Sequence, residues 1–278
     1  MLKDMVHAKK SLGQNFLNSK SVARDIVRAG ELLPTDTVLE IGPGKGFLTK
    51  ELLASGVHVI AVEKDDRMIP ILAEKFAEEI ANKRFILIHG DILENLEKNT
   101  LGLPPSYKLV ANIPYYLTGQ IIRMFLEAGE KPQKMILMVQ KEVATRIVAR
   151  PSTRVARAGE RKESILSIAV KAYGTPKLIK KVPARYFTPA PKVDSAILAI
   201  ENISNTNFPN PATEKHFFEI LHTGFAHKRK MLTGNLKEIF ESKTIQILKE
   251  VGILENARAE NVSLEQWIAL TLKSLHLR

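Results

Sequence analysis

The sequence of 278 residues contains no cysteine. Disulfide bonds, thiolate nucleophiles and cysteine-bound zinc are therefore excluded, and no metal site is predicted. The first ten residues include no apolar signal core, and no long uncharged apolar run occurs along the chain. The sequence therefore predicts neither a secretory signal nor a membrane-spanning helix. Internal repeats and low-complexity tracts are also missing. These absences are typical of a cytoplasmic protein with no membrane partner.

Acidic side chains are too few to balance the basic ones. The chain has 41 lysines and arginines against 30 aspartates and glutamates, which gives a net charge of +11 and a pI near 9.7. Such a surplus favours a polyanionic partner, most often nucleic acid. A basic surface without a specific partner is the alternative interpretation. The hydrophobic fraction of 45% and the chain length allow one large and one small domain.

A glycine-rich corner interrupts the chain at residues 42–46. A short apolar run, residues 38–41, precedes it and predicts a buried strand, while residues 47–53 follow at helical spacing. A strand, a tight loop and a helix in this order open the nucleotide-type site of α/β proteins. Gly42 and Gly44 would let the backbone pass close to a ligand, and the helix start would offer it unpaired N–H groups.

The glycine spacing separates two classes of cofactor. The dinucleotide fingerprint needs a third glycine at position 47, where Phe47 stands, and this makes an oxidoreductase the least favoured enzyme class. The observed G-x-G-x-G spacing, with Glu40 just before it, instead resembles the cofactor loop of S-adenosylmethionine-dependent methyltransferases.

Two further predicted strands, residues 57–62 and 85–89, each lead to an acidic residue. Glu63 lies 21 positions after Gly42, where a doubly wound sheet places an acid that accepts hydrogen bonds from ribose hydroxyls. Asp91 can accept from the exocyclic amine of an adenine, with Ile92 packed on the ring. Ligands of open α/β sheets bind at these carboxyl ends of strands.

Residues 108–111 predict another strand, which leads into the most specific pattern of the chain, Asn112-Ile113-Pro114-Tyr115. Pro114 biases Ile113 towards an extended conformation, so that the Ile113 carbonyl can project away from the sheet. The side-chain carbonyl of Asn112 is a second acceptor, and Tyr115 offers a flat face. Methylation of an exocyclic amine requires such groups, because accepting both N–H hydrogens aims the nitrogen lone pair at a sulfonium methyl group. A proline turn beside a core tyrosine is the structural alternative.

Two other segments are candidates for the same site. Residues 187–195 carry two prolines and predict a rigid segment that leads into a strand. We expect it to present Phe187 opposite Tyr115, since an enzyme that acts on one nucleobase holds the flipped base between aromatic side chains. Near the N-terminus, residues 14–17 (Gln-Asn-Phe-Leu) form either an ordinary basic arm with the lysines before them or a segment folded over a ligand.

Basic residues gather in three places. Arginines recur at near-helical spacing from residue 146 to residue 161, which is typical of a solvated face or of a stripe that follows phosphates. The segment at residues 228–230 (Lys-Arg-Lys) lies between two amphipathic stretches and is a plausible phosphate contact. The remaining cluster comprises Lys177, Lys180, Lys181 and Arg185.

The composition also predicts a domain boundary. Residues 202–211 have the composition of a linker, and the amphipathic stretches beyond them predict helices. We therefore expect an α/β domain over residues 1–200 and a small helical domain over residues 201–278; the family resemblance given next implies that the first is a Rossmann-like methyltransferase domain and the second an RNA-binding domain. Residues 164–172 are compatible with either a strand or a short helix.

Taken together, these segments resemble the ribosomal RNA adenine dimethyltransferase family, and the resemblance covers almost the whole chain. The matching patterns are Gln14 to Leu17, Glu40 to Gly46, Glu63, Gly90-Asp91, Asn112 to Tyr115, and Phe-x-Pro-x-Pro-x-Val-Asp-Ser at residues 187–195.

The resemblance implies an α/β fold with a Rossmann-like S-adenosylmethionine-dependent methyltransferase sheet and a small C-terminal all-helical domain. It implies dimethylation of N6 of two adjacent adenosines near the 3′ end of small-subunit ribosomal RNA, with a role in small-subunit assembly. The implied methyl donor is S-adenosylmethionine, the implied partner is small-subunit RNA or the immature 30S particle, and a monomer is expected.

The family's site residues carry over to matching positions here. The implied cofactor contacts are Asn15, Leu17, Gly42, Glu63, Asp91 and Asn112. Asn112 is also implied to orient the target amine, with Tyr115 and Phe187 as stacking partners. One departure concerns residues 161–167, Arg-Lys-Glu-Ser-Ile-Leu-Ser here, where family members tend to carry Tyr-Gly-x-Leu-Ser. It affects the RNA contacts expected of this loop and not the methyl transfer.

Three alternative functions remain open at this point. They are a large-subunit RNA adenine dimethyltransferase, a DNA adenine methyltransferase, and a ribosome- or transcription-binding protein that keeps the fold without the chemistry. The presence of Asn112, Glu63 and Asp91 argues against the last of these.

Overall fold

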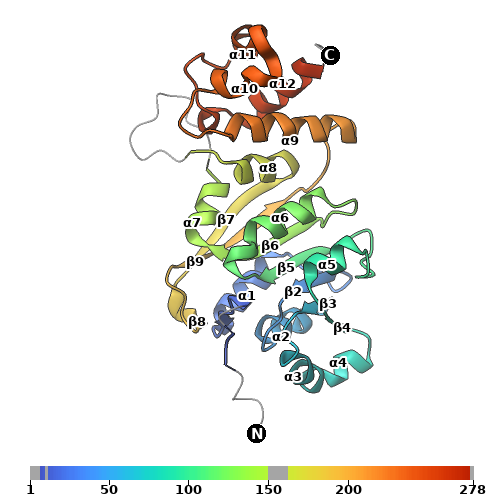
Figure 1. Ribbon diagram of the computed structural model, residues 1–278. Helices are drawn as coiled ribbons and strands as arrows, with labels where there is room; N and C mark the ends of the chain where they lie inside the picture. Colours follow the sequence, from blue (N-terminus) through green and yellow to red (C-terminus); the bar gives the residue numbers. More distant parts are fainter. Residues whose placement is uncertain (1–6, 10–11, 150–161, 276–278) are drawn as a thin grey trace. The chain divides into compact units, whose positions relative to one another are not determined.

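The computed structural model describes residues 7–9, 12–149 and 162–275. By their internal contacts they fall into two compact units, Met1–Ala144 with Thr175–Ile203 and Thr145–Gly174 with Ser204–Arg278. Figure 1 traces the elements of both units along the chain. Within the described ranges, every helix is too short or too polar to cross a lipid bilayer.

The first unit is built on a sheet whose strand order is β4-β3-β2-β5-β6-β9-β7. The strands are β2 (Thr37–Ile41), β3 (His58–Glu63), β4 (Phe85–His89), β5 (Lys108–Asn112), β6 (Lys134–Gln140), β7 (Thr175–Val182) and β9 (Ser195–Glu201). The first five run parallel, β9 is antiparallel to β6, and β7 is antiparallel to β9. Strand order reverses between β2 and β5, which is where open α/β sheets bind ligands. The predicted Rossmann-like α/β sheet is confirmed.

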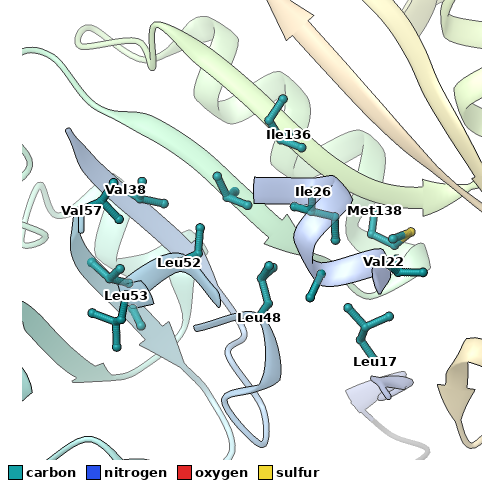
Figure 2. Close-up of a cluster of buried hydrophobic side chains, with 14 of the residues drawn as sticks. Leu17, Val22, Ile26, Val38, Leu48, Leu52, Leu53, Val57, Ile136 and Met138 are labelled. Atoms are coloured by element: carbon teal, nitrogen blue, oxygen red, sulfur yellow. The ribbon is translucent and has the colours of Figure 1, made fainter. Parts of the chain in front are cut away.

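Helices flank this sheet in the first unit, and all but α4 (Ala77–Ala81) bury apolar side chains. They are α1 (Lys20–Ala29), α2 (Phe47–Ala54), α3 (Met68–Lys75), α4 (Ala77–Ala81), α5 (Ile92–Glu97), α6 (Thr118–Glu127) and the start of α7 (Lys141–Ile147). Val22 and Ile26 are four residues apart on α1, so they share one helix face. Figure 2 shows them beside Ile136 and Met138, alternate residues of β6 that face the same side of the sheet. This core fixes the strands whose ends carry the predicted site.

A small two-stranded sheet ties the N-terminal segment to the proline-containing segment. Strand β1 (Phe16–Leu17) pairs antiparallel with β8 (Phe187–Thr188). The next residue, Asn18, extends this link, because its backbone N–H donates to the Tyr186 carbonyl at 2.9 Å. A 3₁₀ turn, η3 (Ala184–Tyr186), precedes β8, and another, η2 (Tyr115–Leu117), follows β5. Phe16 and Leu17 therefore take part in a long-range strand pairing, and this part of the chain does not form a free basic arm.

The second unit is helical in its described residues. It contains α8 (Ile165–Tyr173), α9 (Pro211–Phe225), α10 (Leu232–Phe240), η4 (Glu241–Lys243), α11 (Thr244–Glu250), η5 (Ala259–Asn261) and α12 (Leu264–Leu275). Trp267 is fully buried in its core, with its ring stacked on Phe225 at 5.8 Å between centroids. The predicted helices beyond residue 211 are confirmed.

The grouping of α8 differs from the predicted division at residue 200. Residues 164–172, which were compatible with a strand or a helix, form α8, and Ser164 caps its start. The Tyr173 ring packs against Phe208 of the second unit at 5.4 Å between centroids, and α8 contacts α9 and α12. Residues 145–174 are therefore grouped with the C-terminal helices, because the apolar face of α8 packs there.

Candidate active site at the strand ends

A cleft lies over the carboxyl ends of β2, β3, β4 and β5, beside the reversal of strand order. Its empty volume is about 1060 Å³, open mouth included, and it is lined by residues 12–17, 40–45, 47–48, 62–64, 90–92, 112–117 and 121. The structure thus brings together all eight residues predicted to contact a cofactor and four of the five predicted for catalysis. Phe187 is the residue that it does not bring there.

The glycine loop combines an open position with a closely packed one. Gly42 has φ of +64°, and a Cβ added to it would meet no atom within 4 Å, so its backbone faces free space. Gly46 has φ of +70° and begins α2, and a Cβ there would lie 2.5 Å from the Phe76 ring. Positive φ favours glycine at both positions. The loop is therefore accessible to a ligand at Gly42 and fixed to the core at Gly46.

The carboxylate of Glu63 lies at the end of β3 and is held by two backbone amides. One oxygen accepts from the Gly44 N–H at 2.9 Å and the other from the Asp65 N–H at 2.8 Å. The side chain is 5% exposed, and burial raises the pKa of Glu63. Each oxygen keeps a further lone pair, so each can accept a hydrogen bond from a hydroxyl group of a ligand in the cleft. The position predicted for a ribose contact is thus oriented in advance.

Asp91 follows β4 and lines the cleft, and its side chain also makes two contacts within the protein. It caps α5 by accepting from the Leu93 N–H at 3.0 Å, and it pairs with the Lys64 ammonium at 2.6 Å. Burial alone would raise the pKa of Asp91, but the Lys64 ammonium and the Leu93 amide outweigh it and lower that pKa. The carboxylate therefore stays ionised as an acceptor. The Lys64 pairing was not expected from the sequence.

Asn112 lies at the end of β5, and its amide group has a defined orientation. Its Nδ2 donates to the backbone carbonyl of Asn15 at 3.0 Å. Because that carbonyl can only accept, the nitrogen faces Asn15 and Oδ1 is left as an acceptor. None of the hydrogen bonds among the described residues engages Oδ1. The predicted side-chain acceptor is therefore available at the cleft.

The residues after Asn112 form a rigid tip. Pro114 has φ of −56° and ψ of 133°, and its carbonyl accepts from the Leu117 N–H at 3.0 Å, which closes the η2 turn. Ile113 points its side chain into the core with 2% exposed. The half-buried Tyr115 ring lines the cleft, and its hydroxyl lies 2.6 Å from the Ser195 Oγ. The aromatic face predicted for Tyr115 is thus anchored at its far end.

The prediction for Phe187 needs correction. Its side chain is 3% exposed and belongs to the hydrophobic core of the first unit, and it does not line the cleft. The pairing of β8 with β1 is the physical reason, because it places Phe187 opposite Leu17 and directs the ring into that core. In this structure the ring offers no face opposite Tyr115.

Glu40 lies at the cleft, and its almost complete burial was not evident from the sequence. Its side chain is 1% exposed, and its Oε2 has no hydrogen-bond partner among the described residues. Burial raises the pKa of Glu40 to about 8. The Glu40 carboxyl group is therefore protonated and uncharged at neutral pH. The acid before the loop is visible in the sequence, but its burial depends on how α2 packs.

The structure bears differently on the three basic clusters. Lys177 and Lys180 on β7 each pair with an acid, Glu201 at 2.6 Å and Asp25 at 2.5 Å, so part of that cluster is neutralised. Residues 228–230 are exposed between α9 and α10. Of the arginine series, Arg146 lies in α7, and the members from residue 150 to residue 161 lie outside the described residues.

Strand order, glycine loop and strand-end acids together define a Rossmann-like methyltransferase. The sequence profile of the family described as ribosomal RNA adenine dimethylase matches residues 5–274. The chain therefore belongs to the ribosomal RNA adenine dimethylase family.

Individual relatives agree with this assignment. A protein of Dehalococcoides mccartyi (strain CBDB1) named ribosomal RNA small subunit methyltransferase A is 43% identical over 269 residues, which cover 96% of this chain and 88% of that protein. A protein of the same name from Thermosynechococcus vestitus is 39% identical over 273 residues, covering 96% and 97%.

Two solved structures have the same fold. The crystal structure of the 23S rRNA methyltransferase ErmE covers 93% of this chain and 99% of its own, with a TM-score of 0.71 and 26% identity. A dimethyladenosine transferase from Plasmodium falciparum covers 93% and 96%, with a TM-score of 0.75 and 24% identity. The predicted fold class is confirmed by these structures, and the family resemblance by the family match.

Proposed function

We propose that this chain is an RNA adenine N6-dimethyltransferase that takes methyl groups from S-adenosylmethionine. Its proposed substrate is a pair of adjacent adenosines near the 3′ end of small-subunit ribosomal RNA. The observation that carries the proposal is the orientation of Asn112, whose Nδ2 is bound to Asn15 so that Oδ1 is left to accept from a target amine. Membership of the family supports the choice of substrate.

The residues around the cleft fit S-adenosylmethionine. Open space over Gly42 admits the amino-acid part of the cofactor next to the loop backbone, and the Glu63 carboxylate has acceptor capacity for ribose hydroxyls. Asp91 is an ionised acceptor for the adenine amine, with Ile92 as apolar neighbour. Asn15 and Leu17 close the cleft from the N-terminal side.

The chain's own residues perform the catalysis by positioning. The bound cofactor supplies an electrophilic methyl group on a sulfonium. Asn112 Oδ1 and the Ile113 carbonyl accept the two N–H hydrogens of the target amine, which turns the nitrogen lone pair out of conjugation and towards that methyl group. The Tyr115 ring stacks on the adenine. A strong base is unnecessary, because the nitrogen becomes acidic only after it has attacked, and water can take the proton.

The exposed Lys-Arg-Lys segment at residues 228–230 supports an RNA-binding role for the helical C-terminal part. We assign the immature 30S particle as the partner, the cytoplasm as the location and a monomer as the working form. Light scattering tests the last assignment, since a dimer would contradict it.

The direct experiment is transfer of tritiated methyl groups from S-adenosylmethionine to three substrates: immature small subunits, large subunits and duplex DNA. Labelling of small subunits, with N6,N6-dimethyladenosine recovered after nuclease digestion, is the expected result. Preferential labelling of large subunits would favour the second candidate, which rests on the likeness to the 23S rRNA methyltransferase. Labelling of DNA, or none, would refute the proposed function.

A further inference from the structure

The loop between β3 and α3 contains an ionised side chain that is fully buried. Asp65 has no exposed side-chain surface and does not line the cleft. A buried carboxylate is costly unless it is paired and hydrogen-bonded. Arg67 meets this need in a bidentate geometry, with Nε at 2.8 Å and Nη2 at 2.6 Å. The Arg67 guanidinium holds the pKa of Asp65 well below its usual range.

The N-terminal segment is attached to this ion pair. The Gln14 amide nitrogen donates to Asp65 at 2.8 Å, and the Lys9 ammonium lies 3.5 Å from the same carboxylate. Gln14 also accepts from the Lys9 backbone N–H at 2.8 Å, and Arg67 donates to the His7 carbonyl at 3.2 Å. The Lys9 ammonium also lies 3.5 Å from Asp66, so the polar contacts of His7, Lys9 and Gln14 with the β3–α3 loop gather on residues 65–67.

This attachment lies at one end of the segment that crosses the cleft. Residues 12–17 line the cleft, and their far end, β1, pairs with β8. Asn112 holds the middle through the Asn15 carbonyl. Without the link from Gln14 to Asp65, the near end of the segment would keep only the contacts of His7 and Lys9 with this loop among the described residues.

Asp65 also acts on the other side of the cleft. Its backbone N–H donates to Glu63 at 2.8 Å, so the loop that holds the N-terminal segment also orients the carboxylate proposed to bind ribose. One residue therefore joins two walls of the same cleft.

We propose that Asp65, neutralised by Arg67, is the positioning residue that holds residues 12–17 over the cleft and thereby sets how tightly the cofactor is bound. The proposal rests on the proposed function in taking S-adenosylmethionine as the ligand. Asp65 acts through Gln14 and does not contact the cofactor.

The test compares Asp65→Asn, Gln14→Ala and the double variant by calorimetry with S-adenosylmethionine and by steady-state methyl transfer. Each single variant should raise the Kd and the KM for the donor about tenfold, the effect of losing one hydrogen bond to a charged group. The kcat at saturating donor should stay within about twofold. The double variant should bind no more weakly than Asp65→Asn, because both changes break the same link.

Asp66→Asn is the matched control, since it removes the same charge from the next residue. The Asp66 side chain is 72% exposed and reaches the segment through a 3.5 Å ion pair with the exposed Lys9 ammonium. Because exposed ion pairs contribute little, this variant should bind the donor within about twofold of the unsubstituted chain. If Asp65→Asn does not fold, Asp65→Glu replaces it in the comparison with Gln14→Ala and the double variant, because Gln14 itself lines the cleft and Gln14→Ala alone would not separate the link to Asp65 from a direct contact with the donor. Unchanged donor affinity in Gln14→Ala, or additive losses in the double variant, would overturn the proposal. Failure of the unsubstituted chain to bind the donor would overturn the proposed function as well, so the two failures are distinguishable.

Discussion

The Tyr115 hydroxyl lies 2.6 Å from the Ser195 Oγ, across 80 positions of sequence. Ser195 is fully buried at the start of β9, and Tyr115 is at the tip that follows β5. The contact fixes the plane of the Tyr115 ring, which we propose stacks on the target adenine. It also explains why a serine ends the proline-containing pattern at residues 187–195.

Loss of this anchor should weaken catalysis less than loss of the ring. Tyr115→Phe and Ser195→Ala should each lower kcat for RNA a few-fold and should not be additive, because they break one contact. Tyr115→Ala should lower kcat/KM for RNA roughly 10- to 100-fold, since base–aromatic stacking contributes about 1–3 kcal/mol. Steady-state methyl transfer with saturating donor measures both. Equal losses for Tyr115→Phe and Tyr115→Ala would contradict the stacking role.

Glu40 should make stability fall as pH rises. Burial raises its pKa from 4.5 to about 8, so between these values the folded chain binds a proton that the unfolded chain has released. The stabilisation is complete below pH 4.5, declines as pH rises towards 8, and is lost above it. Glu40→Gln cannot titrate at this position. Its free energy of unfolding should therefore rise relative to that of the unsubstituted chain as pH increases across this window, by up to about 5 kcal/mol. Thermal unfolding of both chains from pH 5 to pH 9 measures the difference, and a pH-independent difference would refute it.

The two glycines at the ends of the loop should respond differently to alanine. Gly46→Ala places a methyl group against the Phe76 ring at positive φ and should destabilise folding by about 2–4 kcal/mol. Gly42→Ala meets open space, so it should destabilise by only about 1–2 kcal/mol while it weakens donor binding. Denaturant unfolding and calorimetry separate these effects. Undiminished donor affinity in Gly42→Ala would argue against a ligand at that position.

Replacing residues 228–230 with three alanines should weaken RNA binding without changing donor binding. Each phosphate contact contributes about 0.7–0.9 to the slope of log K against log salt concentration, so the slope should become shallower by about 2–3. Lys98→Ala serves as the charge control, because Lys98 is an exposed lysine directly after α5 that pairs with Glu94. This variant should leave the slope unchanged. An unchanged slope in the triple variant would remove this segment from the RNA-binding surface.

The strand-end residues could be predicted because each follows an apolar run whose burial is evident from composition. Glu63, Asp91 and Asn112 all lie where the alternation of elements places them. Asp65 could not be predicted, since the sequence shows two adjacent aspartates that look alike. Its side chain has no exposure while that of Asp66 is 72% exposed, and one of the contacts that bury it comes from Gln14, 51 positions away.

The orientation of the Phe187 side chain could not be predicted from the sequence either. Two prolines predict an extended backbone around it, but an extended segment can direct a given side chain to either face. The register of β8 against β1 decides, and that register pairs residues about 170 positions apart. The placement of α8 in the second unit likewise depends on packing with α9 and α12, which periodicity within residues 164–172 does not reveal.

Asn112→Ala tests most directly the central claim that Asn112 Oδ1 holds the target amine. Removing that acceptor should lower methyl transfer to immature small subunits by about 10²–10³-fold, the loss typical of one positioned hydrogen-bonding group in a transition state. Calorimetry should find the Kd for S-adenosylmethionine changed only a few-fold, because the Glu63 and Asp91 contacts remain. Transfer at an undiminished rate by this variant would contradict the account.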